Sequence, residues 1–236
     1  MILSVRNLDF IRQRDRILDG VSFDLKEASI TGLTGPNGGG KTTLFEILLN
    51  FRRATGGEIK WHRPLLCAYV PQVNLPRKVL PLTVKDFVEM GTWGPRQKQG
   101  SAALTLEESL ESLHLHSISE KLISELSGGE WKRASLARSL VQAADLYFLD
   151  EPFNHLDLHM ENQIGHLLQK LKREKNKTFF VISHDWHAMD HFFDHLLLLN
   201  VRLIAEGSVR EISDISMNWR DPQHHAWMHS VAEIPK

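Results

Sequence analysis

Residues 35–43, GPNGGGKTT, combine glycines with a lysine and two threonines, a set of residue types that suits binding of a phosphate chain. They match the pattern G-x-x-x-x-G-K-[ST] and lie between a strand-like and a helix-like stretch, as that pattern requires. Glycines let the backbone curl so that successive N–H groups face one point, and a helix N-terminus adds its positive dipole end. The alternative is a glycine-rich hairpin.

The loop predicts a binding site for the phosphates of a nucleotide together with Mg²⁺. Lys41 would hold the β and γ phosphates, Thr42 would place its hydroxyl on Mg²⁺, and Thr43 would reach the α phosphate or stabilise the turn. The candidate nucleotide-binding residues of this loop are Gly35, Pro36, Asn37, Gly38, Gly39, Gly40, Lys41, Thr42 and Thr43.

Two carboxylates end the apolar stretch LYFLDE, residues 146–151. A buried parallel strand delivers such residues to the carboxyl edge of its sheet, where ligands bind. Asp150 is therefore a candidate partner of Mg²⁺ through a water or another ligand of the metal, and Glu151 could orient or deprotonate the attacking water. The alternative, in which the two acids only cap the next turn, is less favoured beside a phosphate loop.

Two more polar side chains follow apolar strands. The stretch TFFVIS leads into His184, which could contact the γ phosphate and help to position the water. Gln72 follows CAYVP and carries both a donor and an acceptor, so it could sense Mg²⁺ or water. By itself, Gln72 would be only a turn glutamine.

The stretch SELSGGEWKR, residues 124–133, offers Ser127, Gly128 and Gly129 at the start of a predicted helix. The free N–H groups of a helix N-terminus form an anion site, and the glycines would let a phosphate approach the backbone closely. No base or nucleophile stands beside them, and the phosphate loop already has its own lysine. The turn is therefore expected to serve a phosphate held elsewhere.

The surrounding patterns predict an α/β fold of the P-loop NTPase type. Alternating residues near the start predict antiparallel strands, and RRATGGEIKWH predicts a turn that enters a hairpin. A strand, helix and strand rhythm from 146 to 182 predicts a parallel sheet. We expect one domain over residues 1–236: a core with a β subdomain (1–83 and 140–212), an inserted helical subdomain (84–139) and a tail (213–236).

Composition narrows the function classes. The chain has 236 residues, is 42% hydrophobic and has a formal net charge of −1, so it can bury a full core but has no basic field for nucleic acid. Cys67 is the only cysteine, and the start lacks the features of a signal peptide, which fits a reducing cytosol. No apolar run approaches the ~18 to 20 residues that span a bilayer.

With these motifs in this order, residues 1–212 resemble the nucleotide-binding subunit of ABC transporters. The resemblance identifies residues 35–43 as the Walker A loop and residues 126–130 as the signature motif. It assigns the remaining motif residues as Gln72 of the Q-loop, Asp150 and Glu151 of Walker B, Asp157 of the D-loop and His184 of the switch. It implies that two copies sandwich two ATP molecules, each signature motif closing over the γ phosphate of the other copy.

Within that family, AYVPQ, TVKDFVEMG, ISHDW and FFDHLLLLNVRLIAEG look like the ATPases of bacterial manganese, zinc and iron importers. This similarity implies a subunit that hydrolyses Mg·ATP to power uptake of Mn, Zn or Fe through a membrane permease, fed by an extracytoplasmic metal-binding protein. Such a subunit is peripheral, at the cytoplasmic face of the inner (plasma) membrane. No nucleic acid partner is expected.

Some positions depart from the family pattern. Gly39 replaces the usual Ser, Ala or Cys, Glu130 replaces the common signature Gln, and Asn154-His155 precedes the D-loop in place of smaller residues. The aromatic residue expected to stack on adenine is not evident. The candidates near that place are Phe10, Ile11 and Arg12.

Three alternatives stay open: an ABC ATPase that energises another substrate, a soluble ABC ATPase of DNA repair or translation, and a non-hydrolysing regulator. The second is disfavoured because residues 43–126 are too few for a long coiled-coil arm, and the third because every hydrolytic position is present.

Two residue groups could serve partners or metals. Phe87, Val88 and Trp93 could line a groove for the permease or belong to the core. The tail histidines His224, His225 and His229 could sense metal, but such pairs are usually solvated.

Overall fold

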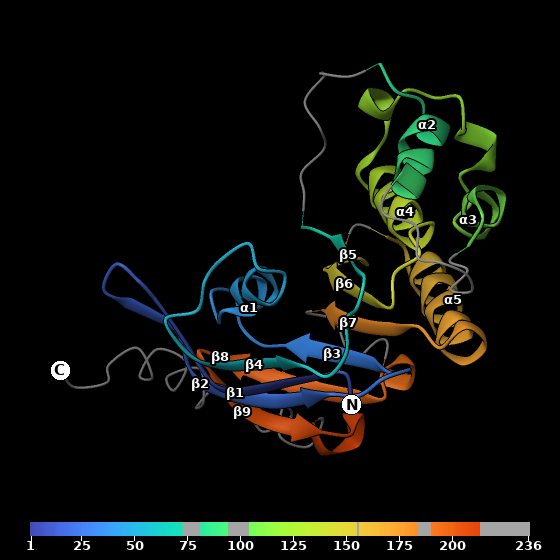
Figure 1. Cartoon of the computed structure of the whole chain (residues 1–236). Helices are drawn as coiled ribbons and strands as arrows, with labels where there is room; N and C mark the ends of the chain where they lie inside the picture. Colours follow the sequence, from blue (N-terminus) through green and yellow to red (C-terminus); the bar gives the residue numbers. More distant parts are fainter. Residues whose placement is uncertain (73–80, 94–103, 155, 184–189, 213–236) are drawn as a thin grey trace, which may run out of the picture.

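A computed structural model describes residues 1–72, 81–93, 104–154, 156–183 and 190–212 (Figure 1). The described chain forms two β-sheets, with a group of short helices rising to one side of them (Figure 1). His155, His184, the tail histidines and the rest of the tail lie outside the described residues.

The smaller sheet is antiparallel and has the strand order β2-β1-β4. Its strands are β1 (Leu3–Arg12), β2 (Asp15–Leu25) and β4 (Gly56–Trp61). β4 alternates between exposed and half-buried residues, as a strand with one solvated face does. The prediction that residues 52–62 enter a hairpin is wrong, because β4 pairs with β1 and the next strand along the chain joins the other sheet.

The larger sheet has the order β5-β6-β7-β3-β8-β9, and all its pairs are parallel except β8 with β9. Its strands are β3 (Ile30–Thr34), β5 (Cys67–Val70), β6 (Leu146–Asp150), β7 (Thr178–Ile182), β8 (His195–Asn200) and β9 (Arg202–Gly207). Every residue of β3, β6 and β7 is buried, as expected of central parallel strands. The carboxyl ends of β5 and β6 consequently meet at one edge.

Five α-helices are described: α1 (Lys41–Leu48), α2 (Val84–Glu89), α3 (Leu106–Ser112), α4 (Gly128–Leu140) and α5 (Leu158–Lys175). Short 3-10 turns cover Met90–Trp93, His116–Ile118, Ile123–Glu125 and Asp190–Phe192. Capping boxes begin α2, α3 and α4, which explains why these short helices start where they do.

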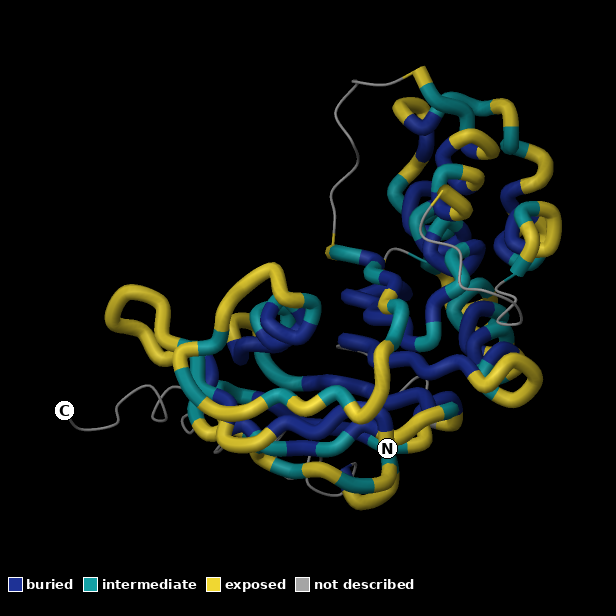
Figure 2. Tube along the Cα trace, viewed as in Figure 1, coloured by how far each residue is buried: buried dark blue, intermediate teal, exposed yellow. Residues whose placement is uncertain are grey.

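The core is divided between two clusters of buried side chains. Buried residues occur in both sheets and in the helices (Figure 2). In one cluster, Phe45 of α1 packs with Phe148 and Phe180 of the large sheet, at ring centroid distances of 5.0 and 4.9 Å. In the other, Phe87 of α2 packs on Trp131 of α4 at 4.9 Å. The first cluster fixes α1 over the sheets, and the second joins α2 to α4.

The expected α/β fold, a mostly parallel sheet with helices and a separate antiparallel sheet, is confirmed. None of the described helices has the length and apolar character needed to cross a membrane.

Candidate functional site

Three positions of the loop from residue 35 to residue 40 adopt backbone conformations that favour glycine. Gly35, Gly38 and Gly40 have φ values of 141°, 80° and 93°, in the left-handed region. A Cβ on Gly35 would lie 1.9 Å from the carbonyl oxygen of Leu199, and one on Gly40 would lie 2.7 Å from that of Ile17. The loop is thus held tightly against the end of β8 and against β2.

Lys41 lies at the centre of this loop. Its side chain is buried, with 7% of the residue exposed, and Nζ donates hydrogen bonds of 2.8 Å to the carbonyl oxygens of Gly35 and Pro36. Burial lowers the pKa of Lys41, an effect that the nearby carboxylates of Glu151 and Asp150 oppose. The ammonium therefore stands where phosphate oxygens could replace the two carbonyls as its partners.

Thr42 and Asp150 meet across the site. The Thr42 hydroxyl donates to Oδ2 of Asp150 at 3.0 Å, and Asp150 is fully buried at the end of β6. Its other oxygen, Oδ1, is buried without a hydrogen-bond partner among the described residues, and burial raises the pKa of this carboxyl. A buried carboxylate oxygen beside a hydroxyl provides the hard oxygen ligands that Mg²⁺ prefers, so these residues fit the metal.

Glu151 is held in one orientation by two amide side chains. Its Oε2 accepts hydrogen bonds of 2.5 Å from Nε2 of Gln72 and from Nδ2 of Asn154. The backbone of Glu151 is left-handed, with φ of 51°, and its N–H donates to the Ile182 carbonyl oxygen at 3.1 Å. Such strained conformations often occur at functional sites, where the surroundings impose them.

Parallel pairing brings the predicted site residues together. β5 delivers Gln72, the neighbouring β6 delivers Asp150 and Glu151, and α1 begins with Lys41 and Thr42. The close arrangement of Gln72 beside Glu151 agrees with its expected place in the site. His184 follows the adjacent strand β7 but lies outside the described residues.

Asp157 begins α5. Its Oδ1 accepts a hydrogen bond of 2.9 Å from the N–H of Met160, so the side chain caps this helix. The described contacts give Asp157 this structural role. Its predicted place at a nucleotide stays a prediction.

The predicted anion site at residues 127–129 is built on a capping box. The Ser127 hydroxyl accepts from the Glu130 N–H at 3.3 Å, and the Glu130 carboxylate accepts from the Ser127 N–H at 2.7 Å. Lys121 forms an ion pair with Glu130 at 3.1 Å. The hydrogen bond from the Ser127 backbone is the largest of the effects that lower the pKa of Glu130, with Lys121 adding to it. The glutamate that departs from the family pattern thus stabilises this turn as a charged cap.

The turn stays open toward its surroundings. A Cβ on Gly128 would meet nothing within 4 Å, so packing within the chain does not require this glycine. Among the described residues, none accepts the backbone N–H of Gly128 or Gly129, and none joins the turn to the phosphate loop. The described chain therefore does not bring the two predicted phosphate-binding elements together.

Other residues lie near the predicted groove and the adenine position. A cavity of about 360 Å³ between β5, α2 and α4 is lined by Tyr69, Val70, Pro71, Phe87, Trp131, Ser135, Arg138, Ser139 and Gln142. Trp93 is largely exposed, but Val88 is fully buried, so of the two predicted alternatives for Val88, a groove or the core, the structure places it in the core. Near the adenine position, Phe10 packs against the core while Ile11 and Arg12 are exposed.

Sequence reasoning missed two contacts of Glu151. Asn154 was noted only as a departure from the family pattern, yet its amide holds the carboxylate. Lys132, one turn into α4, donates from Nζ to the Glu151 carbonyl oxygen at 3.2 Å. Neither contact has a sequence signal, because the Lys132 contact depends on how α4 packs on the residue after β6, and the Asn154 contact depends on the conformation of the turn after β6.

Comparison with known proteins shows which family and which relatives the chain is similar to. The family model described as ABC transporter matches residues 18–154. The manganese transport system ATP-binding protein MntB of Halalkalibacterium halodurans is 36% identical over 221 residues, which cover 89% of this chain and 88% of that protein. The zinc transport system ATP-binding protein TroB of Treponema pallidum is 38% identical over 220 residues, covering 88% and 81%.

A solved structure of a metal-chelate type ABC transporter, in an inward-facing conformation, is also similar. It matches with a TM-score of 0.74 and 29% identity, covering 89% of this chain and 84% of that one.

Proposed function

We propose that this chain, which belongs to the ABC transporter family as an ATP-hydrolysing subunit, powers uptake of a divalent metal ion through a membrane permease. Members of this family bind nucleotide. The observation that carries the chemistry is the carboxylate of Glu151, fixed by Gln72 and Asn154 beside the Thr42–Asp150 pair. The metal assignment is supported by relatives named for manganese and zinc transport, which align over nearly nine-tenths of this chain.

The phosphate loop would bind the triphosphate of ATP. Its backbone N–H groups and Lys41 neutralise the phosphate oxygens, and Thr43 contributes at the α phosphate. Thr42 and Asp150 would hold Mg²⁺, with Gln72 beside them, and the metal would draw charge from the phosphate oxygens. Ile11 or Arg12, both exposed, would contact the base.

Glu151 would act as general base. Its carboxylate accepts a proton from water as the water oxygen attacks the γ phosphorus, and the bond from that phosphorus to the β–γ bridging oxygen breaks. Gln72 and Asn154 orient the carboxylate, so less reorganisation is needed during the reaction. His184 would contact the γ phosphate from the neighbouring strand.

A second copy of the chain would complete each site. The open turn at Ser127, Gly128 and Gly129 has helix N–H groups to offer and no described partner within the chain. A γ phosphate held by the other copy would supply that partner. Asp157, at the start of α5, would lie at the same interface.

The permease would bind at the cavity between β5, α2 and α4, where Phe87 contributes to the lining and Trp93 is exposed nearby.

Closure of two copies on ATP would move the helical subdomain, residues 84–139, against the core of residues 1–83 and 140–212. The chain would therefore act peripherally at the cytoplasmic face of the membrane, and an extracytoplasmic metal-binding protein would deliver the ion. Binding energy is converted to conformational change in this way.

Metal uptake in the host tests this proposal. We expect that deletion of the chain lowers accumulation of Mn²⁺, Zn²⁺ or Fe²⁺, and that the wild type but not Glu151→Gln restores it. Normal uptake of all three ions by the deletion strain, with loss of uptake of another solute, would favour a different substrate.

A further inference from the structure

Three lysines of the described chain are at least nine-tenths buried: Lys41, Lys132 and Lys177, with exposed fractions of 7, 7 and 2%. Lys41 belongs to the phosphate loop. Lys177 donates from Nζ to the carbonyl oxygen of Ala144 at 2.8 Å. Ala144 lies just before β6 begins, at the opposite end of that strand from Asp150. Lys132 is the one whose role the proposed chemistry leaves unexplained.

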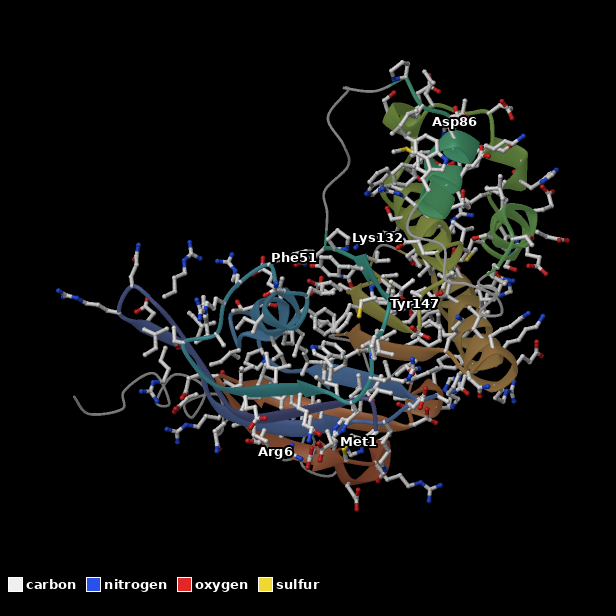
Figure 3. All side chains as sticks on the ribbon, in the orientation of Figure 1. Met1, Arg6, Phe51, Asp86, Lys132 and Tyr147 are labelled. Atoms are coloured by element: carbon white, nitrogen blue, oxygen red, sulfur yellow. The ribbon has the colours of Figure 1, made fainter. Side chains whose placement is uncertain are left out.

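Lys132 reaches from the signature helix to the general base. It lies on α4 one turn after Gly128, and its Nζ donates to the Glu151 carbonyl oxygen at 3.2 Å. Figure 3 labels Lys132 beside the end of the large sheet, where β5 and β6 finish. The bond therefore joins a helix of the inserted segment to the residue that follows β6.

The ammonium of Lys132 is also within electrostatic reach of two acids. Burial lowers its pKa, while the negative charges of Glu151 and Asp150 oppose that shift. Within the described part of the chain, its one hydrogen bond, 3.2 Å long and to a neutral carbonyl, compensates little for the cost of removing an ammonium from water. An apolar side chain of similar length would cost less to bury, so the charge serves something other than stability.

The contact falls on a strained point of the backbone. Glu151 has a left-handed φ of 51°, and its carbonyl oxygen is the acceptor for Lys132 while its N–H bonds to Ile182. Within its own turn, the Glu151 carbonyl oxygen also accepts a longer hydrogen bond of 3.4 Å from the Asn154 N–H, so Lys132 and Ile182 supply the contacts to the Glu151 backbone from outside that turn. Such bonds are what maintains a conformation that a glutamate does not prefer.

We propose that Lys132 is a positioning residue that holds Glu151 in its left-handed conformation and supplies positive charge beside its carboxylate. The inference rests on the proposed function, in which Glu151 is the general base. Since α4 begins at the turn that would bind the ATP of the other copy, the same helix both serves that ATP and positions the base of its own chain. The two sites of a dimer are thereby linked through one helix.

The test uses the full chain at high protein concentration with excess Mg·ATP, measuring kcat, KM for ATP and the thermal unfolding midpoint. Lys132→Met removes charge and hydrogen bond, Lys132→Gln keeps a donor without charge, and Lys132→Arg keeps both. Lys177→Met is the matched control, because it removes another buried lysine that bonds to a backbone carbonyl. Each Lys132 substitution is repeated in the Glu151→Gln background.

We expect Lys132→Met to lower kcat by roughly ten- to a hundredfold, the effect of misplacing a catalytic group, with KM for ATP little changed. The unfolding midpoint should stay the same or rise. Lys132→Arg should recover most of the rate, and Lys177→Met should keep it. In the Glu151→Gln background, Lys132→Met should lower the residual rate no further, because the base it positions is gone. If Lys132→Met does not fold, Lys132→Gln decides by the same comparisons.

A wild-type kcat in Lys132→Met would overturn the inference, as would an equal loss in Lys177→Met or an undiminished loss in the Glu151→Gln background. Failure of the proposed function looks different: Glu151→Gln alone would then hydrolyse ATP at the wild-type rate.

Discussion

The Thr42 hydroxyl donates to Oδ2 of Asp150 at 3.0 Å, joining the start of α1 to the end of β6. Asp150 is fully buried and its Oδ1 has no hydrogen-bond partner among the described residues. The ammonium groups of Lys41 and Lys132 offset part of the cost of burying this carboxylate, and a bound metal ion would offset more of it. The buried charge of Asp150 is therefore better explained by metal binding than by a contribution to the stability of the fold.

Asp150→Asn should therefore abolish metal-dependent hydrolysis without unfolding the protein. We expect kcat to fall by roughly a hundredfold or more, because a metal ligand is lost, while the thermal unfolding midpoint stays the same or rises. ATPase assays over a Mg²⁺ titration and thermal unfolding check both. Thr42→Val should raise the Mg²⁺ requirement, and Thr42→Ser, which keeps the hydroxyl, is its control. Unchanged Mg²⁺ dependence in Asp150→Asn would refute the assignment.

Gln72 and Glu151 give a second prediction. Gln72→Glu replaces an amide donor with a carboxylate at the same place, so it repels the carboxylate of Glu151 and displaces it. Gln72→Ala only removes the hydrogen bond. We expect kcat to fall about tenfold in Gln72→Ala and further in Gln72→Glu, as is typical for loss of a hydrogen bond that orients a charged group. Equal rates in the two variants, measured at saturating Mg·ATP, would show that Gln72 does not act on the carboxylate.

Glu130 predicts a pH-dependent stability. The Ser127 N–H and Lys121 lower the pKa of Glu130 in the folded protein, so its stabilising contribution is complete above the unfolded pKa and is lost as pH falls through the folded one. Glu130→Gln should therefore lower the free energy of unfolding at pH 7 by about 0.5–1 kcal/mol, the typical value of a cap. The difference from wild type should shrink as the pH falls below 4.5, the ordinary pKa of a glutamate.

Urea unfolding of both proteins at pH 7 and pH 4 measures this difference. A gap of constant size at the two pH values would mean that the charge of Glu130 is not part of the cap.

How far the sequence alone predicts this molecule depends on the range of the interactions involved. The phosphate loop and the apolar strand before Asp150 and Glu151 were predictable, because each is recognised from residues that are adjacent in the sequence: the glycines, lysine and threonines of the loop, and the apolar run of the strand. The strand that pairs with β4 was not predictable, because residues 56–61 pair with β1, which lies far earlier in the sequence. Alternation of polar and apolar residues indicates a strand but does not say which strand it pairs with.

Burial was the second limit. Val88 had been a candidate for a groove, since helical spacing does not say which face of α2 meets α4, and the structure puts it in the core. Lys132 was passed over for the same reason, because a lysine in a polar stretch is usually solvated. Asn154 acts on Glu151 only through the turn after β6.

The turn at residues 127–129 predicts complementation between two damaged copies. Ser127→Arg or Gly129→Asp should keep ATP binding but abolish hydrolysis, because each blocks the anion site offered to the other copy. Lys41→Ala damages the phosphate loop instead. Mixing Ser127→Arg with Lys41→Ala chains would form some dimers with one intact site, so part of the activity should return. Full activity of Ser127→Arg alone, or no recovery in the mixture, would contradict action across an interface.

Glu151→Gln provides the decisive measurement. The substitution keeps the shape and the phosphate loop but removes the base, so ATP should remain bound and unhydrolysed between two copies. Light scattering on a sizing column, with Mg·ATP in the buffer, should give twice the mass of the 236-residue chain for Glu151→Gln, and the mass of one chain without nucleotide. A Glu151→Gln protein that stays monomeric with Mg·ATP, or that hydrolyses ATP at the wild-type rate, would contradict a dimer closed on ATP with Glu151 as its base.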